Sequence, residues 1–134
     1  MHSILMMDKK VYDLRDAIYE GRLAQVLDLL NCGLDVNIKD DDGGTPIMWS
    51  AEAGHTNITH VLLKHGAGVN TVDNDGWSAI LHAAQVNQVE VVRLLLDYKA
   101  DATQKSNNGW TALSIAYRNG NHLLITLLEK YKTG

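Results

Sequence analysis

The chain has 134 residues, of which 46% are hydrophobic and 21% charged, so it is long enough for one domain with a buried core. Its net charge of -4 argues against electrostatic capture of nucleic acid or of an anionic membrane, since both require clustered lysine and arginine. The single cysteine, Cys32, excludes an internal disulfide and has no CxxC or Cys/His pattern beside it, which favours a cytoplasmic protein without a zinc site.

The first residues do not resemble a targeting segment. The apolar run from Ile4 to Met7 is short, and it has neither a basic segment before it nor a small-residue cleavage site after it. No run approaches the roughly 18 apolar residues of a membrane span. We therefore treat residues 1–7 as an N-terminal extension and expect no membrane association.

One repeat period dominates the rest of the chain. Four columns of similar residues recur every 33 positions: Gly43, Gly76 and Gly109; Thr45, Ser78 and Thr111; Leu29, Leu62, Leu95 and Leu128; Ala17, Ser50, Ala83 and Ala116. Because all four columns keep one register, they indicate a repeated structural unit.

Each unit has the pattern of a turn, a helix, a second turn and a second helix. Ser78 and Thr111 are expected to cap a first helix with their hydroxyl groups, and Pro46 suits the first helical position after Thr45. That helix should end at a column that admits only glycine or asparagine, the residues that best tolerate left-handed backbone: Gly21, Gly54, Asn87 and Gly120. The second helix is too apolar for one buried face, so neighbouring units should cover it on both sides.

Two segments carry a family resemblance. DDGGTPIMWSAEAGHTNITHVLLKHGAGVN and DNDGWSAILHAAQVNQVEVVRLLLDYKADA closely resemble the ankyrin-repeat pattern of a Gly-x-Thr-Pro-Leu turn, paired alanines, Gly-His, a leucine run and Gly-Ala-Asp-Val-Asn. The resemblance implies an all-α ankyrin solenoid of helix-turn-helix units with hairpin-like turns. It covers residues 8–134, as a capping unit (8–39), two full units (40–72 and 73–105) and a second capping unit (106–134). Glu129, in the column of Leu63 and Leu96, is expected to face water.

Two departures from the family pattern affect packing. The histidine usual after Thr-Pro-Leu is replaced by Met48, Leu81 and Ser114, so apolar packing is expected to substitute for its hydrogen bonds. Lys99 occupies the column of Gly33 and Gly66, where left-handed backbone is expected at a cost of roughly 1 kcal/mol.

No motif indicates catalysis. The patterns GxGxxG after a strand, GxxxxGK[ST], HExxH and GxSxG do not occur, so we expect neither an enzyme nor a cofactor. His55, His60 and His65 follow one another at spacings of five, which do not share a helical face, so we expect no metal site.

The family resemblance implies that a partner protein docks on the concave face formed by the turn tips and the first helices. The expected partner-binding residues on the tips are Asp41, Asp42, Asn74, Asp75, Trp77, Asn107, Asn108 and Trp110, and those on the helices are Tyr19, Glu52, Gln85, Val86, Arg118 and Asn119. Trp77 and Trp110 are either interaction hot spots or packed turn residues. The turn aspartates indicate a basic partner, or only a solvated turn.

We expect the array to be a monomer, and three functions remain open for it. The first is a protein-interaction module. The second is a reader of basic or methyl-lysine peptide tails, because TPIMWSAE resembles a stretch of the ankyrin domains of certain histone methyltransferases, where Trp49 and Glu52 match cage positions. Gly44 and His82 stand where that family has tryptophans. The third is a regulatory subunit that covers an enzyme.

Overall fold

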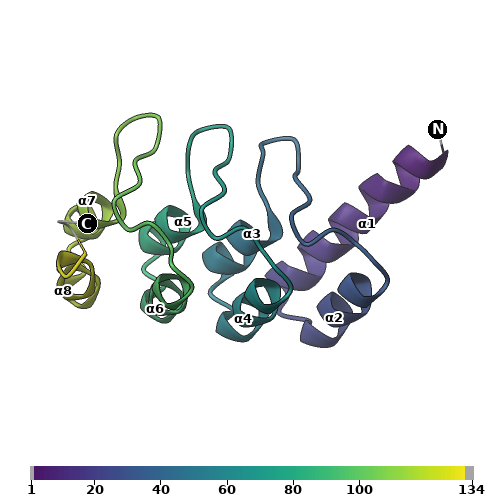
Figure 1. The fold of residues 1–134 in the computed structure, drawn as a ribbon, viewed down its shortest axis with the longest axis horizontal. Coiled ribbons are helices and arrows are strands. Elements are labelled where there is room, and N and C mark those ends of the chain that lie inside the picture. The colour runs from purple at the N-terminus through teal and green to yellow at the C-terminus, as the bar shows by residue number, and fades with distance from the viewer. Residues whose placement is uncertain (1, 132–134) are drawn as a thin grey trace.

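A computed structural model describes the backbone of residues 2–131 and the side chains of residues 9–131. Within these residues the fold is all-α, which confirms the predicted class. The helices are α1 (His2–Tyr19), α2 (Leu23–Asn31), α3 (Pro46–Ala53), α4 (Thr56–Lys64), α5 (Ala79–Gln85), α6 (Val89–Asp97), α7 (Ala112–Asn119) and α8 (His122–Glu129). Figure 1 shows α2, α4, α6 and α8 in one row, with the other helices beside them and three long loops extending to the opposite side.

The first helix is longer than its counterparts in the later repeats. Residues 2–7, expected to be an extension ahead of the repeats, form the first turns of α1. In Figure 1 this part of α1 projects away from the stacked helices.

The first helices end where the sequence predicts. Gly54 and Gly120 are left-handed C-caps with φ of 76° and 66°, and Gly21 and Asn87 follow α1 and α5 with φ of 74° and 62°. Left-handed backbone at these positions stops the helix and turns the chain toward the second helix of the repeat.

The expected hydroxyl cap forms at one of the predicted positions and is absent at the other. Thr111 Oγ1 accepts a hydrogen bond from the backbone N–H of Ser114, and Ser114 Oγ accepts one from the backbone N–H of Thr111. Ser78 has the extended backbone of an N-cap, but its hydroxyl makes no cap hydrogen bond, so that prediction is wrong. In the third repeat the residue equivalent to Ser114 is Leu81. Its side chain has no polar atom that could accept a hydrogen bond from the backbone N–H of Ser78, so the reciprocal pair cannot form.

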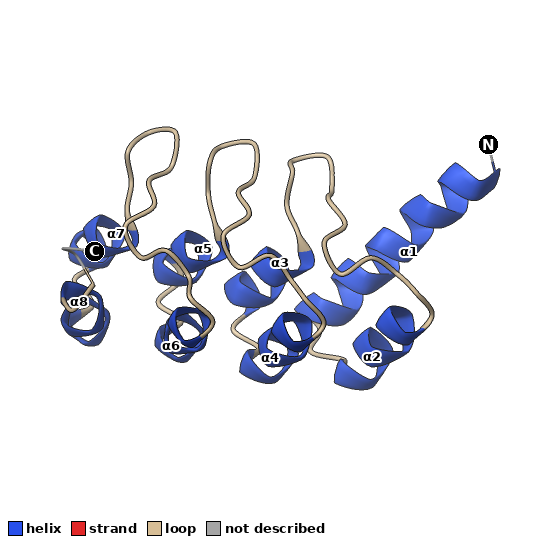
Figure 2. Cartoon of the chain, viewed as in Figure 1, coloured by secondary structure: helices blue, strands red, loops and turns tan. Residues whose placement is uncertain are grey.

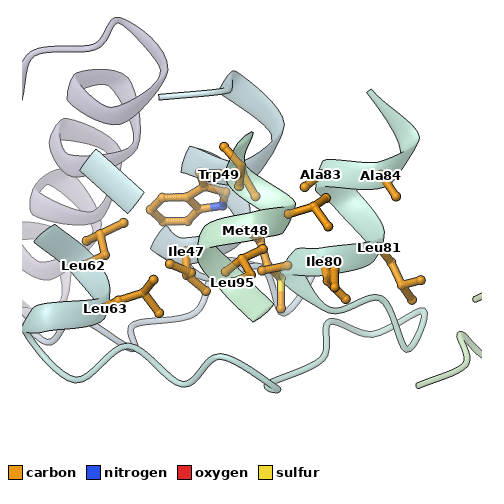
Figure 3. Close-up of a cluster of buried hydrophobic side chains, with 14 of the residues drawn as sticks. Ile47, Met48, Trp49, Leu62, Leu63, Ile80, Leu81, Ala83, Ala84 and Leu95 are labelled. Carbon is orange, nitrogen blue, oxygen red and sulfur yellow. The ribbon is translucent and has the colours of Figure 1, made fainter. Parts of the chain in front are cut away.

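The core runs along the whole stack. Met48 and Leu81 are 1% and 0% exposed, which agrees with apolar packing in place of the usual histidine. Figure 3 shows them among side chains of α3, α4, α5 and α6. The second helix of the third repeat buries Val91, Val92 and Leu95 almost completely, as expected for a helix covered on both sides.

The loops before α3, α5 and α7 are hairpin-like turns (Figure 2). In the third repeat Asp73 N–H donates to Trp77 O at 2.9 Å, and Val72 and Ser78 form an isolated antiparallel bridge. Neighbouring turns are tied together: the backbone N–H of Asn74 donates to Asp42 O, and that of Asn107 donates to Asp75 O, both at 3.0 Å. The turns therefore stack as a ladder beside the first helices.

Candidate functional site

A pocket of about 370 Å³ opens between the turns of the second and third repeats and the first helices. Its walls come from α1 (Arg15 and Tyr19), α3 (Met48, Trp49 and Glu52), α5 (His82) and the two turns (Asp40, Asp42, Gly44, Asp73 and Asp75). Five carboxylates and one guanidinium line it, so the pocket is strongly acidic.

His82 stands between two of the carboxylates. Its Nδ1 lies 3.0 Å from Glu52 Oε1, and its Nε2 lies 2.9 Å from Asp73 Oδ2. Burial alone would lower the pKa of His82, but the hydrogen bonds to Glu52 and Asp73, together with their charges, outweigh it and raise the pKa above the usual 6.5. The charged imidazolium is therefore the favoured partner of both carboxylates.

Glu52 is the centre of a short hydrogen-bonded chain across the repeats. Tyr19 Oη donates to Glu52 Oε2 at 3.0 Å, while His82 faces the other carboxylate oxygen. The hydrogen bond from His82 is the main cause that lowers the pKa of Glu52 below 4.5, against the opposing effect of burial. Burial, followed by the charge of Glu52, raises the pKa of Tyr19. Three successive repeats thus contribute to one site.

Asp40 and Asp73 organise the turns that frame the pocket. Asp40 Oδ1 accepts hydrogen bonds from the backbone N–H groups of Asp42 and Gly44 at 2.9 and 2.8 Å. Asp73 Oδ1 accepts from Asp75 and Trp77 at 3.0 and 2.9 Å. With one oxygen fixed by the backbone, each aspartate directs its other oxygen toward a first helix.

Trp49 does not lie on the open surface, contrary to its expected role as a direct partner contact. Only 3% of it is exposed, and its Nε1 donates to Asp40 Oδ2 at 3.2 Å. The guanidinium carbon of Arg15 lies 5.9 Å from the centre of its ring, and Arg15 Nη1 is 3.8 Å from Asp40 Oδ2. Trp49 belongs to the buried core, and Figure 3 shows its ring among the other buried side chains. It therefore forms part of the pocket wall and is not an open contact surface.

The pocket brings together several of the other predicted residues. Tyr19, Asp42, Glu52 and Asp75 line it, and Gln85 and Val86 join Glu52 and His82 around an adjoining hollow of about 300 Å³. Asp41 is exposed on the turn of the second repeat. Apart from the apolar Val86, these residues give this part of the expected binding face an acidic and polar character.

Three asparagines that were expected to contact a partner instead form hydrogen bonds between neighbouring repeats. The side-chain nitrogens of Asn74 and Asn107 donate to carbonyls of the preceding turn, Asp41 O at 3.3 Å and Asn74 O at 3.2 Å. Asn119 Nδ2 donates to Gln85 O at 3.1 Å. Their amide groups therefore have structural partners, although all three residues remain exposed.

The tryptophans beside the turn glycines are half-buried. Trp77 packs against the core, with its ring centre 5.4 Å from that of His82. Trp110 also packs against the core, with the Arg118 guanidinium carbon 5.3 Å from its ring centre. Both have packing roles while still presenting part of their surface. Asn108 and Arg118 are exposed on the fourth repeat and do not line the acidic pocket.

The set of expected binding residues lacks four that shape the site: Arg15, Asp40, Asp73 and His82. The repeat period could have identified Asp40, Asp73 and His82. Asp40 and Asp73 are equivalent residues of successive repeats, and so are Trp49 and His82. In each repeat the ring nitrogen of the aromatic residue is hydrogen-bonded to the aspartate of the same repeat. Among the described side chains there is no group of three or more histidine, cysteine, aspartate or glutamate residues suited to holding a metal ion.

A family model described as ankyrin repeats (3 copies) matches residues 14–106 and 69–133. The chain belongs to the ankyrin-repeat family. Proteins of this family generally act as protein-protein interaction modules and are typically not enzymes. The ankyrin array seen in the structure is thus also recognised from the sequence by an independent comparison.

Among curated proteins, the relatives with similar segments include acyl-CoA-binding domain-containing proteins. The identity is 38% over 52 residues with protein 2 of Arabidopsis thaliana, 37% over 54 residues with protein 6 of Xenopus tropicalis, and 31% over 55 residues with protein 4 of Oryza sativa subsp. japonica. These matches cover 36%, 40% and 41% of this chain, and 15%, 19% and 16% of the relatives. The chain therefore matches less than a fifth of the length of each relative.

In the described part of the chain, none of the helices has the length and apolar character needed to cross a bilayer.

Proposed function

We propose that this chain binds a partner protein on its concave face and turn tips, and that the partner inserts a basic side chain into the acidic pocket. The general role of ankyrin repeats supports the first part of the proposal. The observation that carries the second part is the excess of carboxylates in the pocket, five against one guanidinium. A cation entering there would gain charge-assisted hydrogen bonds in a partly desolvated site.

Besides His82, the pocket already holds a guanidinium of the chain itself. Arg15 lies over the ring of Trp49 and near Asp40, which supports the idea that a guanidinium suits this mixture of aromatic and acidic groups. Asp42 and Asp75 are exposed on the two turn tips at the entrance. They are the carboxylates that an approaching arginine or lysine would meet first.

The alternative functions fit the site less well or follow from the same surface. A methyl-lysine cage requires several open aromatic walls, whereas Trp49 is buried below Arg15 and Trp77 packs beside His82. A regulatory subunit would use the same face to cover an enzyme, so the identity of a folded partner decides between these roles. The matched segments make up less than a fifth of each relative, which is too little to carry the acyl-CoA binding in their names over to this chain.

Neutralising the entrance carboxylates tests the proposal directly. Asp42→Asn combined with Asp75→Asn should weaken partner binding, because it removes two negative charges while keeping side-chain size. The matched control combines Asp28→Asn with Asp97→Asn, which removes two exposed charges from the second helices α2 and α6. Each protein is used as bait, and Kd is measured for every retained partner. Equal affinity for the entrance variant and the control would contradict a role for the pocket.

The half-buried tryptophans provide a second test of the binding face. If Trp77 and Trp110 anchor the partner, changing both to alanine should weaken binding by at least about 2 kcal/mol, the usual effect at a hot spot. Because both rings also pack against the core, circular dichroism must show that the variant remains folded at the temperature of the assay. Unchanged affinity would make them packing residues only.

An array of peptides separates the partner classes. Binding that is selective for particular basic peptide sequences, with or without methylated lysine, supports a reader of peptide tails. Capture of a folded protein without such selectivity among peptides supports an interaction module or a regulatory subunit.

A further inference from the structure

We infer that His82 controls the acidic pocket through its protonation state. As an imidazolium it holds Glu52, and when it loses its proton it releases Glu52 to bind the cation of a partner. The inference rests on the proposed function, since it concerns the same pocket and the same class of ligand.

The geometry around the ring requires a proton on each nitrogen. Nδ1 and Nε2 lie 3.0 and 2.9 Å from oxygens of Glu52 and Asp73. An ionised carboxylate only accepts hydrogen bonds, and a neutral imidazole has one donor and one acceptor. Both contacts are therefore favourable only in the charged form, and loss of the proton turns one of them into a repulsion.

The two carboxylates differ in how firmly they are held. The Asp73 side chain is 13% exposed, and its other oxygen accepts two backbone hydrogen bonds from its own turn. The Glu52 side chain is 36% exposed and retains only the hydrogen bond from Tyr19. The proton that remains on neutral His82 should therefore stay on Nε2, facing Asp73, so that Glu52 is the carboxylate released.

The surrounding charges favour the same exchange. From α1 the pocket receives Arg15 and the hydroxyl of Tyr19, and from the turns it receives Asp40, Asp42 and Asp75. The charged residues of α6 and α7, the other helices packed against α5, do not line it: Glu90, Arg93, Asp97 and Arg118. The imidazolium is thus one of two cations in a ring of carboxylates, and a partner's cation would compete with it directly.

Proton release and cation binding are therefore linked in both directions. A guanidinium in the pocket stabilises ionised carboxylates without help from His82, so it lowers the affinity of His82 for its proton. Burial alone would lower the pKa of His82, but its hydrogen bonds to Glu52 and Asp73 and their charges raise it above 6.5, so the exchange takes place above that pH. The pocket should accept a basic side chain better at pH 8.5 than at pH 5.5.

The experiment measures binding of the peptide Ac-Gly-Gly-Arg-Gly-Gly-NH2 by NMR titration at both pH values. The same peptide with citrulline in place of arginine keeps the shape of the side chain and removes its charge. We expect the arginine peptide to bind about fivefold more tightly at pH 8.5, which corresponds to about 1 kcal/mol for one additional exposed ion pair. The citrulline peptide should show no such change.

Two variants locate the effect. His82→Gln should bind the arginine peptide equally at both pH values, while His122→Gln, which changes an exposed histidine on α8, should keep the pH dependence of the parent. If His82→Gln fails to fold, Glu52→Gln provides the test, since it should weaken binding at pH 8.5 much more than at pH 5.5.

The outcomes separate this inference from the proposed function. Arginine binding that is equally strong at both pH values in the parent overturns control by His82 and leaves the basic-partner proposal intact. Retention of the pH dependence in His82→Gln has the same meaning. Absence of arginine binding at both pH values overturns both the control by His82 and the basic acceptor role of the pocket.

Discussion

At the scale of single residues, left-handed backbone follows the second helices α2, α4 and α6. Gly33 and Gly66 adopt φ of 93° and 91°, and Lys99 adopts 71° in the same column. A lysine pays a steric penalty there that glycine avoids, because its Cβ approaches the following carbonyl oxygen. The predicted positive φ at Lys99 is therefore confirmed, and the repeat tolerates the strain.

Lys99→Gly should stabilise the protein by up to about 1 kcal/mol, the steric relief reduced by the greater entropy of glycine in the unfolded chain. The reverse change, Gly66→Lys, should destabilise by a similar amount, since a Cβ at Gly66 would meet no atom within 4 Å and only the backbone strain remains. Urea denaturation gives both values. A destabilising effect of Lys99→Gly would show that the lysine side chain makes a larger stabilising contribution than the strain it causes.

At the scale of elements, the His82 and Glu52 pair joins the third repeat to the second. The raised pKa of His82 means that its contribution to stability is complete below pH 6.5 and is lost as the pH rises through the folded-state pKa. The lowered pKa of Glu52 means that its contribution is complete above pH 4.5 and is lost as the pH falls through the folded-state pKa. The pair therefore stabilises the fold most between about pH 4.5 and 6.5.

The free energy of unfolding of the parent should decrease between pH 6 and pH 9, and His82→Gln should show a smaller decrease. Urea denaturation across this range, followed by circular dichroism, provides the measurement. His122→Gln serves as the control for an exposed histidine. An identical pH profile for the parent and His82→Gln would mean that the ion pairs do not couple to folding.

The stacking of the turns depends on close contact at particular glycines. A Cβ at Gly76 would lie 2.4 Å from Asn107 Oδ1 and 2.8 Å from the backbone nitrogen of Asn107. Gly109, on the fourth repeat, has a similar φ of 86° against 79°, but a Cβ there would meet nothing within 4 Å. The two positions share the backbone strain and differ in the contact with the next turn.

Gly76→Ala should therefore destabilise the protein by about 1 to 3 kcal/mol more than Gly109→Ala, the usual effect of overpacking where backbone cannot easily shift. Because alanine has a similar backbone strain at both positions, that strain drops out of the difference between the two destabilisations. Thermal and urea denaturation of the two variants give the difference. If both variants lose the same free energy of unfolding, the close contact between Gly76 and Asn107 does not contribute to stability.

At the scale of the whole molecule, each repeat packs only against its neighbours in the stack. The stability of the array is therefore the sum of the stabilities of the repeats and of the interfaces between neighbours. Within the described residues the fourth repeat has one neighbour, and Leu123 on α8 is 69% exposed. The strained residue Lys99 lies at the junction to that repeat. Both features should make the fourth repeat the first to open.

Hydrogen exchange tests this order of opening. Backbone amides of residues 123–128 in α8 should exchange faster than those of residues 91–96 in α6, measured by NMR under native conditions. Lys99→Gly should slow exchange in α8 more than in α6, because it relieves strain at that junction. Equal protection in the two helices would mean that the array opens as one cooperative unit.

The repeat architecture follows from local rules that the sequence carries in every unit. Gly54 and Asn87 stop helices because their backbones tolerate positive φ, and that requirement acts within a few residues of chain. The positive φ of Lys99 could be predicted in the same way from its glycine column. The sequence also indicated the deep burial of Val92 and Leu95, since their helix carries more apolar residues than one buried face would hold and so needs neighbours on both sides.

The geometry of the pocket is a property of the tertiary structure, because the contacts that form it join residues of different repeats. Tyr19, Glu52 and His82 come from three successive units, and their hydrogen bonds depend on how far one repeat is shifted and rotated against the next. Sequence spacing identified Tyr19 and Glu52 on one face but gave no distance between them. The burial of Trp49 was settled in the same way, since its environment is the neighbouring helix and the guanidinium of Arg15, which no local rule places.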